Sequence, residues 1–310
     1  PFASCYVCVV YIENMRGMQP SCSTKITEGM SIITDSEEVF KARKAALNLL
    51  LSNHYADCIA PCKLTCPAGV DVQGYISLID KGLYSEAIGL IKETNPLPAI
   101  CGRVCVRPCE LACRRNLLDE GAGVGIDYLK RFAADKDLES ENHYKPKLVP
   151  KTGKKIAIIG AGPGGLSAAY FLQQKGHQCD IFEAAPEAGG WLRYGIPEYR
   201  LPNDIIDKEV ATITELGVNI YCNKKLGQNI SYKEIEKEYD ATIITIGSQI
   251  GTLAGVEGDD AENVFSGIDF LRNMAMTGQK YDFSNKTIAV VGGGNTAMDC
   301  CRTSVRCKAQ

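Results

Sequence analysis

The cysteines are the residues whose type and spacing could do chemistry. Seven of them fall between residues 58 and 113, in two runs whose members are separated by three residues. The runs are Cys58, Cys62 and Cys66, then Cys101, Cys105, Cys109 and Cys113. Such short spacing can present several sulfurs to one small inorganic group, and a proline closes the first run, as in many iron–sulfur ligand runs. Iron–sulfur clusters, structural zinc and disulfides are the three alternatives, and the rest of the chain favours iron–sulfur clusters.

The overall composition is that of a multidomain globular protein. The 310 residues are enough for two or three domains, and 45% hydrophobic with 23% charged residues is ordinary. A net charge of -3 gives no reason to expect nucleic acid or an acidic membrane surface as a partner. The sequence contains no run of eighteen apolar residues, so we expect no membrane-spanning helix. The fifteen cysteines accompany a nucleotide-binding sequence, so we expect metal ligation in the reducing cytoplasm rather than a secreted disulfide scaffold.

Residues 1–35 are expected to form part of a small β-rich module. Alternating apolar residues at Val7, Val9 and Tyr11, and a later pair at 32–33, indicate short strands. The module contains Cys5, Cys8 and Cys22, for which a zinc knuckle or incidental thiols are the alternatives to a cluster. The segment resembles the ferredoxin-like domain at the front of complex I and hydrogenase electron-input subunits. That resemblance implies a [2Fe–2S] site that lacks one ligand, because the family's further cysteine would precede the point where this chain begins.

Residues 36–135 are expected to form a small helical domain. Ser36 is a typical helix N-cap, and apolar residues at three- and four-residue steps predict a helix that ends near His54. Further helices are predicted over 72–78 and 84–92, and another over 108–116 would place two cysteines on one face. The complex I-like family uses a histidine after its helix, which implies His54 as a ligand, and a surface histidine is the alternative. Sulfurs that point inward would let an inorganic group stabilise so small a core.

The pattern CxxxCP…NPLPAICGRVC…CExxC resembles the N-terminal domain of the glutamate synthase small subunit, which also occurs at the front of dihydropyrimidine dehydrogenase. This resemblance implies two [4Fe–4S] clusters with interleaved ligands. One would use Cys58, Cys62 and Cys113, the other Cys66, Cys105 and Cys109, and Cys101 matches a cysteine that need not be a ligand. Tyr55 replaces a family cysteine, and Lys130 replaces a Gln or Glu ligand of some members. The number of clusters is therefore one or two.

A first nucleotide-binding motif follows a polar linker over 136–153. A buried strand runs into G-x-G-x-x-G and then a helix, as in dinucleotide-binding folds. The candidate residues are Gly160, Gly162, Pro163, Gly164 and Gly165. The first glycine permits the tight turn, the second lets the backbone approach a pyrophosphate, and the last lets helix and strand pack closely. Glu183, at the end of the second strand, is expected to accept hydrogen bonds from ribose hydroxyls.

The segment after Glu183 resembles the flavin-contacting segment of the glutamate synthase small subunit family. It contains Gly-Gly-Trp-Leu-Arg-Tyr-Gly-Ile-Pro-Glu-Tyr-Arg-Leu-Pro. The resemblance implies that Gly190, Trp191, Arg200 and Leu226 contact FAD. For Arg200, a surface salt bridge is the alternative. A predicted strand over 240–246 ends in a T-x-G turn, which resembles the second flavoprotein signature.

A second nucleotide motif follows about 130 residues after the first. Residues 286–297 read as a strand, G-x-G-x-x-A and the start of a helix, which is typical of an NAD(P)-binding domain. Its candidate residues are Gly292, Gly293, Gly294, Asn295 and Thr296. The residues that would distinguish NAD from NADP are not reached before Gln310. We expect the chain to be a fragment that is truncated at both ends.

The predicted protein is therefore multidomain. It has a partial ferredoxin-like domain (1–35), a helical iron–sulfur domain (36–135), a linker (136–153), the N-terminal part of a Rossmann-like FAD domain (154–282) and the start of an NAD(P)-binding domain (283–310). Together the last two form an α/β two-dinucleotide-binding flavoprotein fold. The closest family resemblance is to the FAD- and NAD(P)-dependent iron–sulfur oxidoreductases.

This order of motifs predicts an electron-transfer oxidoreductase. A nicotinamide carries two electrons as hydride, a cluster carries one at a time, and FAD can exchange with both. Electrons would pass between NAD(P)H and a partner through FAD, the [4Fe–4S] clusters and the [2Fe–2S] cluster, with no protein acid–base residue required. The resemblances imply a hydrogenase, a formate dehydrogenase, ferredoxin or the glutamate synthase large subunit as partner. The alternative is a zinc-stabilised, non-catalytic assembly module with a vestigial nucleotide fold.

Overall fold

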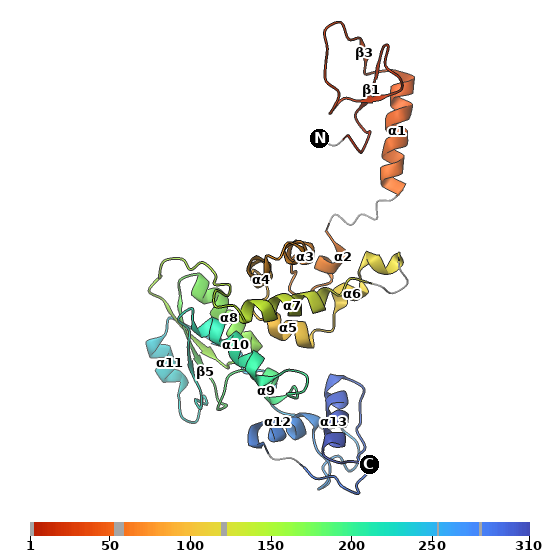
Figure 1. Ribbon diagram of the computed structural model, residues 1–310. Coiled ribbons are helices and arrows are strands. Elements are labelled where there is room, and N and C mark those ends of the chain that lie inside the picture. The colour runs from red at the N-terminus through yellow and green to blue at the C-terminus, as the bar shows by residue number, and fades with distance from the viewer. Residues whose placement is uncertain (1–2, 53–58, 119–122, 253, 279–280) are drawn as a thin grey trace. The chain divides into compact units, whose positions relative to one another are not determined.

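The computed structural model describes residues 3–52, 59–118, 123–252, 254–278 and 281–310. It divides into two compact units, residues 1–60 and residues 61–310. The first unit is a three-stranded antiparallel sheet of order β2-β1-β3, followed by one helix (Figure 1). Its elements are β1 Val9–Ile12, β2 Gln19–Pro20, β3 Ile32–Ile33 and α1 Glu37–Ser52.

The core of the first unit lies between β1 and the start of α1. Ser36 caps this helix as expected, because its Oγ accepts a hydrogen bond from Val39 N at 3.3 Å. Arg43 Nε donates to Val9 O at 2.8 Å, which holds the helix on the strand. The expected alternation is only partly right, since Val9 is buried together with Val10, while Tyr11 is exposed.

The second unit begins with a helical part. Its elements are α2 Pro61–Leu64, α3 Val72–Asp80, α4 Tyr84–Lys92, α5 Pro98–Val104, α6 Pro108–Leu111, the 3-10 helix η1 Arg114–Leu117 and α7 Ile126–Leu138. Helices α3 and α4 confirm two of the predicted helices. Tyr75, Ile88 and Ile91 are almost completely buried, so the helices share an apolar core although they are short.

The single helix expected over 108–116 is wrong. The backbone becomes extended at Cys113, with φ -63° and ψ 125°, and so separates α6 from η1. The Asn116 side-chain amide donates to Glu110 O at 2.9 Å and closes this break. Polar side chains such as asparagine offer the backbone hydrogen bonds that compete with a continuous helix. Cys109 and Cys113 therefore do not occupy positions i and i+4 of one helix.

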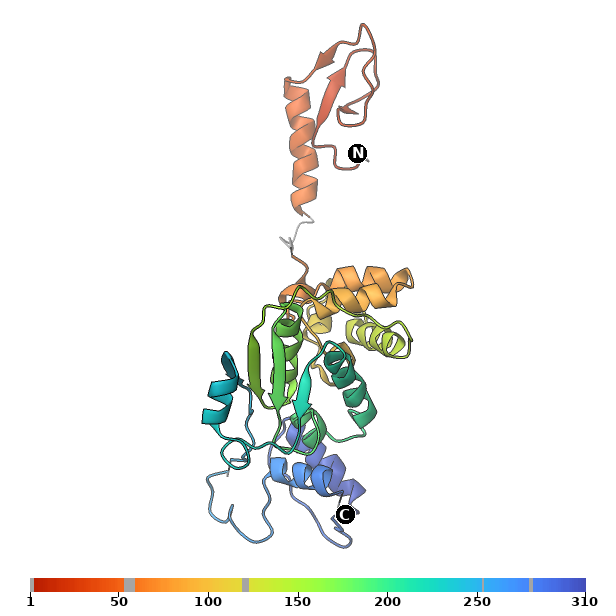
Figure 2. The same cartoon turned by 90° about the vertical axis from the view of Figure 1, so that its left-hand side faces the viewer.

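The α/β part contains a four-stranded sheet in which every pairing is parallel, with strand order β6-β5-β4-β7 (Figure 2). Its elements are β4 Lys155–Ile159, α8 Pro163–Gln174, β5 Gln178–Phe182, α9 Trp191–Tyr194, α10 Asn203–Thr214, β6 Asn219–Tyr221, α11 Tyr232–Glu238 and β7 Ala241–Ile244. Because side chains alternate along a strand, Ile158 packs with the core that includes α8 and α10, while Ile159 packs with Ile235 of α11. Burial on both faces explains the continuous apolar run of β4.

The C-terminal part consists of α12 Gly267–Thr277 and α13 Asn295–Arg306 with the loops around them. Helix α13 begins where the second glycine motif predicts it. The strand expected before that motif, over 286–291, is wrong. No strand among the described residues pairs with this segment, and Val291 is 93% exposed. A strand needs a neighbour to satisfy its backbone groups, and this segment has none.

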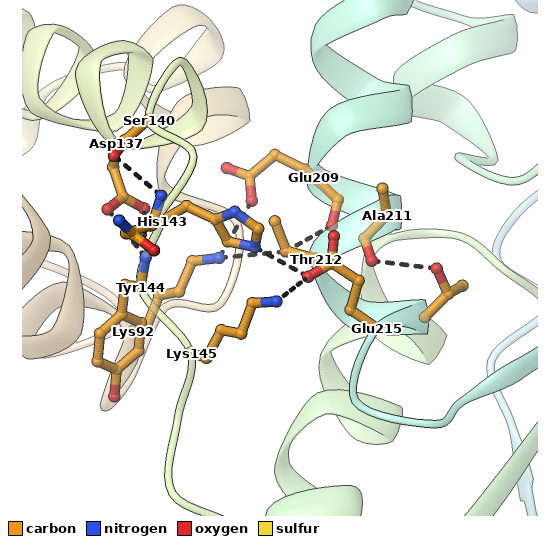
Figure 3. Close-up of polar contacts among 12 residues, drawn as sticks. Lys92, Asp137, Ser140, His143, Tyr144, Lys145, Glu209, Ala211, Thr212 and Glu215 are labelled. Atoms are coloured by element: carbon orange, nitrogen blue, oxygen red, sulfur yellow. Dashed lines mark hydrogen bonds and ion pairs between the residues drawn. The ribbon is translucent and has the colours of Figure 1, made fainter.

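Buried and half-buried polar contacts join the helical part to the α/β part (Figure 3). Lys92 Nζ of α4 lies 3.2 Å from Thr212 Oγ1 and 3.5 Å from Glu209 Oε2, both on α10. Glu209 Oε1 also accepts a hydrogen bond from Ala99 N of α5 at 2.6 Å. Glu209 is fully buried, so α10 is fixed against two helices of the cysteine-bearing part.

A second group of contacts lies closer to the surface of the same junction. Glu215, at the end of α10, accepts from His143 Nε2 at 3.0 Å and pairs with Lys145 Nζ at 2.9 Å. Asp137 of α7 accepts hydrogen bonds from Tyr144 N at 3.0 Å and Ser85 Oγ at 2.5 Å. These contacts anchor the chain that leads from α7 to β4. In the described part of the chain, no helix is long and apolar enough to cross a membrane.

Candidate metal centre and nucleotide sites

Two cysteines of the second run converge with an aspartate that no motif singled out. The sulfurs of Cys101 and Cys105 and a carboxylate oxygen of Asp127 all lie within 4.8 Å of one another. Cys101 lies in α5, Cys105 caps its C-terminus in an extended conformation, and Asp127 lies in the first turn of α7. The two helices can approach because residue 102 is glycine. A Cβ at Gly102 would lie 2.8 Å from the Arg131 backbone.

Two cations face this group. Lys130 Nζ lies 3.0 Å from Cys101 Sγ and 2.7 Å from Asp127 Oδ1. Arg107 Nε lies 3.3 Å from the other oxygen of Asp127. Burial alone would lower the pKa of Lys130, but Cys101 and Asp127 outweigh it and hold that pKa above its usual range. Lys130 is therefore a buried ammonium group that donates to a thiol and a carboxylate.

The other cysteines of this part line the same small core. Cys109 is buried, and burial raises its pKa to about 11. Burial also raises the pKa of Cys105 and of Cys62, and Cys113 lies close enough to Cys62 to contribute to that rise. Cys66 packs against the main apolar core. A bound metal can replace these protons, so inward-facing thiols with this burial fit an inorganic centre.

Two predicted metal ligands cannot be compared with this geometry. His54 and Cys58 lie outside the described residues.

Two of the three cysteines of the first unit, Cys8 and Cys22, are in contact. The backbone N–H and the thiol of Cys22 donate to Cys8 Sγ and lower the pKa of Cys8 to about 7. In turn, the hydrogen bond with Cys8 raises the pKa of Cys22, to which the charge of Cys5 adds a smaller contribution. The three sulfurs are near the surface. Cys5 is near enough for its charge to act on Cys22, but no hydrogen bond joins it to the other two in the described structure.

The first glycine motif forms a tight turn between β4 and α8. Gly160 has a φ of 107°, and a Cβ there would lie 2.6 Å from Thr245 O. A Cβ at Gly165 would lie 1.9 Å from Gly160 O, so the helix could not approach the turn with any larger residue. Gly162 is the N-cap of α8, and the atom nearest to a Cβ added there would be 3.9 Å away. Space therefore remains where backbone N–H groups at the helix N-terminus favour an anion.

Glu183 lies beside this turn, although it ends the neighbouring strand. Its carboxylate accepts hydrogen bonds from Ala161 N at 2.6 Å and from Ala185 N at 2.8 Å. It is therefore fixed at the edge of the glycine loop. Pro163 and Gly164 begin the helix that follows, and a Cβ at Gly164 would meet only the Thr245 side chain, at 3.6 Å.

The residues implied as flavin contacts are only partly brought together. Gly190 lies against the glycine loop, because its Cβ would be 2.9 Å from Gly162 Cα. Trp191 follows it and donates from Nε1 to Ser248 O at 2.8 Å. Arg200 instead pairs with Asp299 Oδ2 of α13 at 2.6 Å. Leu226 packs on the other face of the sheet, against the cluster that contains Ile235.

The second glycine motif lies at the start of α13. Gly292 has a φ of 123°, and Gly294 caps the helix. A Cβ at Gly293 or Gly294 would meet nothing within 4 Å. Asn295 and Thr296 form the first residues of this helix, whose N-terminus provides N–H donors for an anion.

Sequence reasoning missed Asp127 and the buried pair of Lys92 and Glu209. The only signal for Asp127 is an acidic residue one turn before Lys130 in the same helix. Lys92 and Glu209 are each buried in an amphipathic helix. From the sequence alone, a charged residue in such a helix is predicted to face solvent. Their partners are far apart in the sequence, so spacing alone could not reveal them.

Comparison with known proteins matches two family models to this chain. Residues 33–142 match the model described as dihydropyrimidine dehydrogenase domain II, 4Fe-4S cluster. Residues 154–310 match the model described as pyridine nucleotide-disulphide oxidoreductase. The first match contains both groups of cysteines in the helical part, and the second contains both glycine motifs. These matches confirm the expectation of a 4Fe–4S domain followed by a nucleotide-binding domain with a parallel sheet.

Curated relatives extend over most of this chain. It is 40% identical over 257 residues to the NADPH-Fe(3+) oxidoreductase subunit beta of Geobacter sulfurreducens, covering 80% of this chain and 37% of that protein. It is 40% identical over 270 residues to the NADP(+)-dependent formate dehydrogenase subunit beta of Moorella thermoacetica, covering 80% and 38%. Identity to the Escherichia coli glutamate synthase [NADPH] small chain is 35% over 260 residues, covering 79% and 54%. The chain thus spans about 37–54% of the length of these relatives.

Proposed function

The chain belongs to the pyridine nucleotide-disulphide oxidoreductase family, and from this premise we propose that it transfers electrons between NAD(P)H and a partner protein. FAD would be bound by the first glycine motif and [4Fe–4S] clusters by the helical part. The observation that carries the proposal is the direct contact between these parts. Helix α5, which contains Cys101, donates from Ala99 N to Glu209 of the nucleotide-binding part. A short electron path between flavin and clusters requires such a fixed junction.

The nucleotide-binding part would supply binding and orientation rather than acid–base chemistry. FAD accepts electrons in pairs and releases them singly, which is the chemistry that this site requires. The first glycine motif would hold the pyrophosphate through Gly160, Gly162, Pro163, Gly164 and Gly165. Glu183 would accept a hydrogen bond from a ribose hydroxyl. Gly190 and Trp191 would cover the flavin, and Arg200 and Leu226 complete the proposed set. We propose no catalytic side chain.

The second motif would receive the nicotinamide nucleotide. Gly292, Gly293, Gly294, Asn295 and Thr296 would bind its pyrophosphate at the N-terminus of α13, where the open space beside two of the glycines supports this role. Both NADH and NADPH are candidates for this site, and their rates of oxidation by the whole protein distinguish them. The relatives named above include an NADPH-Fe(3+) oxidoreductase subunit and an NADP(+)-dependent formate dehydrogenase subunit, which supports NADPH.

The helical part would hold one or two [4Fe–4S] clusters. The proposed ligands are Cys58, Cys62, Cys66, Cys101, Cys105, Cys109 and Cys113, with His54 as a further candidate. The 4Fe-4S family match supports this assignment, as does the partial or complete burial of the described thiols. A zinc-stabilised, non-catalytic module is not favoured, since zinc would leave both glycine motifs without a role.

The first unit would extend the electron path. Cys5, Cys8 and Cys22 are proposed as ligands of a [2Fe–2S] cluster. The contact between Cys8 and Cys22 supports this proposal. The domain limits proposed are 1–35, 36–135, 136–153, 154–282 and 283–310, and the protein is proposed to be cytoplasmic.

The partner is proposed to be another subunit or a carrier protein. The proposed candidates are a hydrogenase, a formate dehydrogenase, ferredoxin and a glutamate synthase large subunit. The relatives are named as subunits or chains, which supports a multi-subunit assembly. The net charge of -3 offers nucleic acid no electrostatic attraction.

Nucleotide oxidation by the anaerobically purified whole protein tests this proposal. We expect it to oxidise NADPH or NADH with methyl viologen as acceptor, and comparison of the two nucleotides identifies the donor. A Gly293→Val variant tests the second motif separately from the fold, because a Cβ at this position would meet no atom within 4 Å. It should retain FAD and be reduced by dithionite, yet accept electrons from the nucleotide at least tenfold more slowly. Oxidation of neither nucleotide by the unaltered protein contradicts the proposal.

A further inference from the structure

The buried carboxylate of Asp127 is placed as a ligand is, not as a surface acid. Only 1% of its side chain is exposed, and one of its oxygens lies within 4.8 Å of the sulfurs of both Cys101 and Cys105. Each oxygen faces one cation, Lys130 Nζ at 2.7 Å and Arg107 Nε at 3.3 Å, and each has a second lone pair that these contacts do not use. A buried carboxylate with lone pairs still available is costly unless something else binds them.

The charges around the group match a set of anionic ligands. Ligation of iron requires ionised thiols, so Cys101, Cys105 and Asp127 would present three negative charges in a space with little water. Lys130 lies 3.0 Å from one of these sulfurs, and Arg107 lies 3.3 Å from the carboxylate. Each carboxylate oxygen has two lone pairs, so Asp127 can bind a metal and still pair with a cation.

The backbone keeps these three residues together. Cys105 ends α5 with ψ of 141°, which directs the chain away after the thiol, and its sulfur accepts from Arg107 N at 3.3 Å. Glu110 Oε1 accepts from Asp127 N at 2.8 Å and so fixes the start of α7 beside α6. The Tyr75 hydroxyl donates to Ile126 O at 2.9 Å from the other side. Asp127 is therefore held in place by contacts that do not use its carboxylate.

From this geometry we propose that Asp127 is a non-cysteine ligand of an iron–sulfur cluster that is also bound by Cys101 and Cys105. Lys130 is a positioning residue that donates a hydrogen bond to the Cys101 sulfur. An oxygen ligand donates less charge to iron than a thiolate does, and a hydrogen bond to a sulfur also favours the reduced cluster. Both features raise the potential of this cluster. The inference depends on the proposed iron–sulfur function.

Two substitutions test the ligand directly. Asp127→Cys offers a thiolate in place of the carboxylate, so we expect the iron and sulfide content to stay native. The midpoint potential of one cluster should fall and its electron paramagnetic resonance spectrum should change. In the double variant Asp127→Leu with Lys130→Met, one cluster's iron should be lost, about four atoms per chain. That double variant removes the buried pair together, and Arg107, the other partner of Asp127, is 31% exposed and can be solvated instead, so we expect the fold to stay largely intact.

Asp135→Asn is the matched control, because it removes a carboxylate from the same helix. Asp135 pairs with Arg103 at 2.8 Å and is 31% exposed, so this change should leave both iron content and spectrum native. Circular dichroism and flavin content show whether each variant is folded. If the folded double variant retains native iron and the native spectrum, Asp127 is an ion-pair partner only and the proposal is overturned. An unaltered protein without iron would instead contradict the proposed function.

Discussion

A Glu209→Leu variant is expected to lose about 3–5 kcal/mol of unfolding free energy, because it leaves one member of a buried ion pair alone. Glu209 has no exposed surface, and Lys92 is 3% exposed. Burial raises the pKa of Glu209, whereas Lys92 and the Ala99 N–H oppose this rise and favour the carboxylate. Removal of the carboxylate would leave the N–H group at the start of α5 without its acceptor, and would leave the buried ammonium group with the Thr212 hydroxyl but no negative charge beside it.

The double variant Lys92→Met with Glu209→Leu is the matched control. Replacing both charges by apolar side chains of similar size removes the unpaired ammonium group, so most of the loss should be recovered. The measurement is the midpoint of urea unfolding of the whole protein. Midpoints are compared between variants whose unfolding free energy falls with the same slope against urea concentration. If the single variant is as stable as the double variant, the pair does not hold the helical part against α10.

The second large effect is expected from Gly165→Ala. The new Cβ would lie 1.9 Å from Gly160 O, a backbone atom that cannot move without opening the turn between β4 and α8. Thr245 Oγ1 donates to the same carbonyl oxygen at 3.1 Å, so the change also disturbs the contact with the end of β7. We expect overpacking to cost about 1–3 kcal/mol or more and FAD to be absent from the purified variant.

Gly162→Ala separates packing from cofactor binding. The nearest atom to its Cβ is 3.9 Å away, so this variant should keep the unfolding midpoint of the unaltered protein. If the pyrophosphate of FAD approaches the backbone here, the methyl group should weaken FAD binding at least tenfold, as measured by flavin fluorescence during dilution. Native FAD affinity in Gly162→Ala would place the cofactor elsewhere than over this turn.

Local patterns predicted the first nucleotide motif well. The turn at Gly160, the start of α8 and the two-sided burial of β4 all follow from residue types within a few positions of one another. Helices α1, α3 and α4 were predicted for the same reason, since their caps and apolar spacing are local. The parallel sheet follows in turn, because a strand, a helix and a second strand in this order pair in parallel.

Contacts between distant segments were not predictable. Asp127 meets Cys101 only because Gly102 lets α5 and α7 approach closely, and no spacing in the sequence encodes that approach. The break at Cys113 depends on the Asn116 side chain, which competes with the helix. The segment over 286–291 has the composition of a buried strand, but it can form one only where another strand lies beside it and pairs with its backbone. In the described structure this segment forms neither a helix nor a strand.

The most direct test of this account is the metal and flavin content of the whole protein, purified without oxygen. We predict iron with an equal amount of acid-labile sulfide, little zinc, bound FAD, and a resonance signal of reduced [4Fe–4S] clusters when NADPH or NADH is added. That last signal requires nucleotide, flavin and clusters to be joined in one electron path. A colourless protein that contains zinc, no flavin and no such signal would contradict the account.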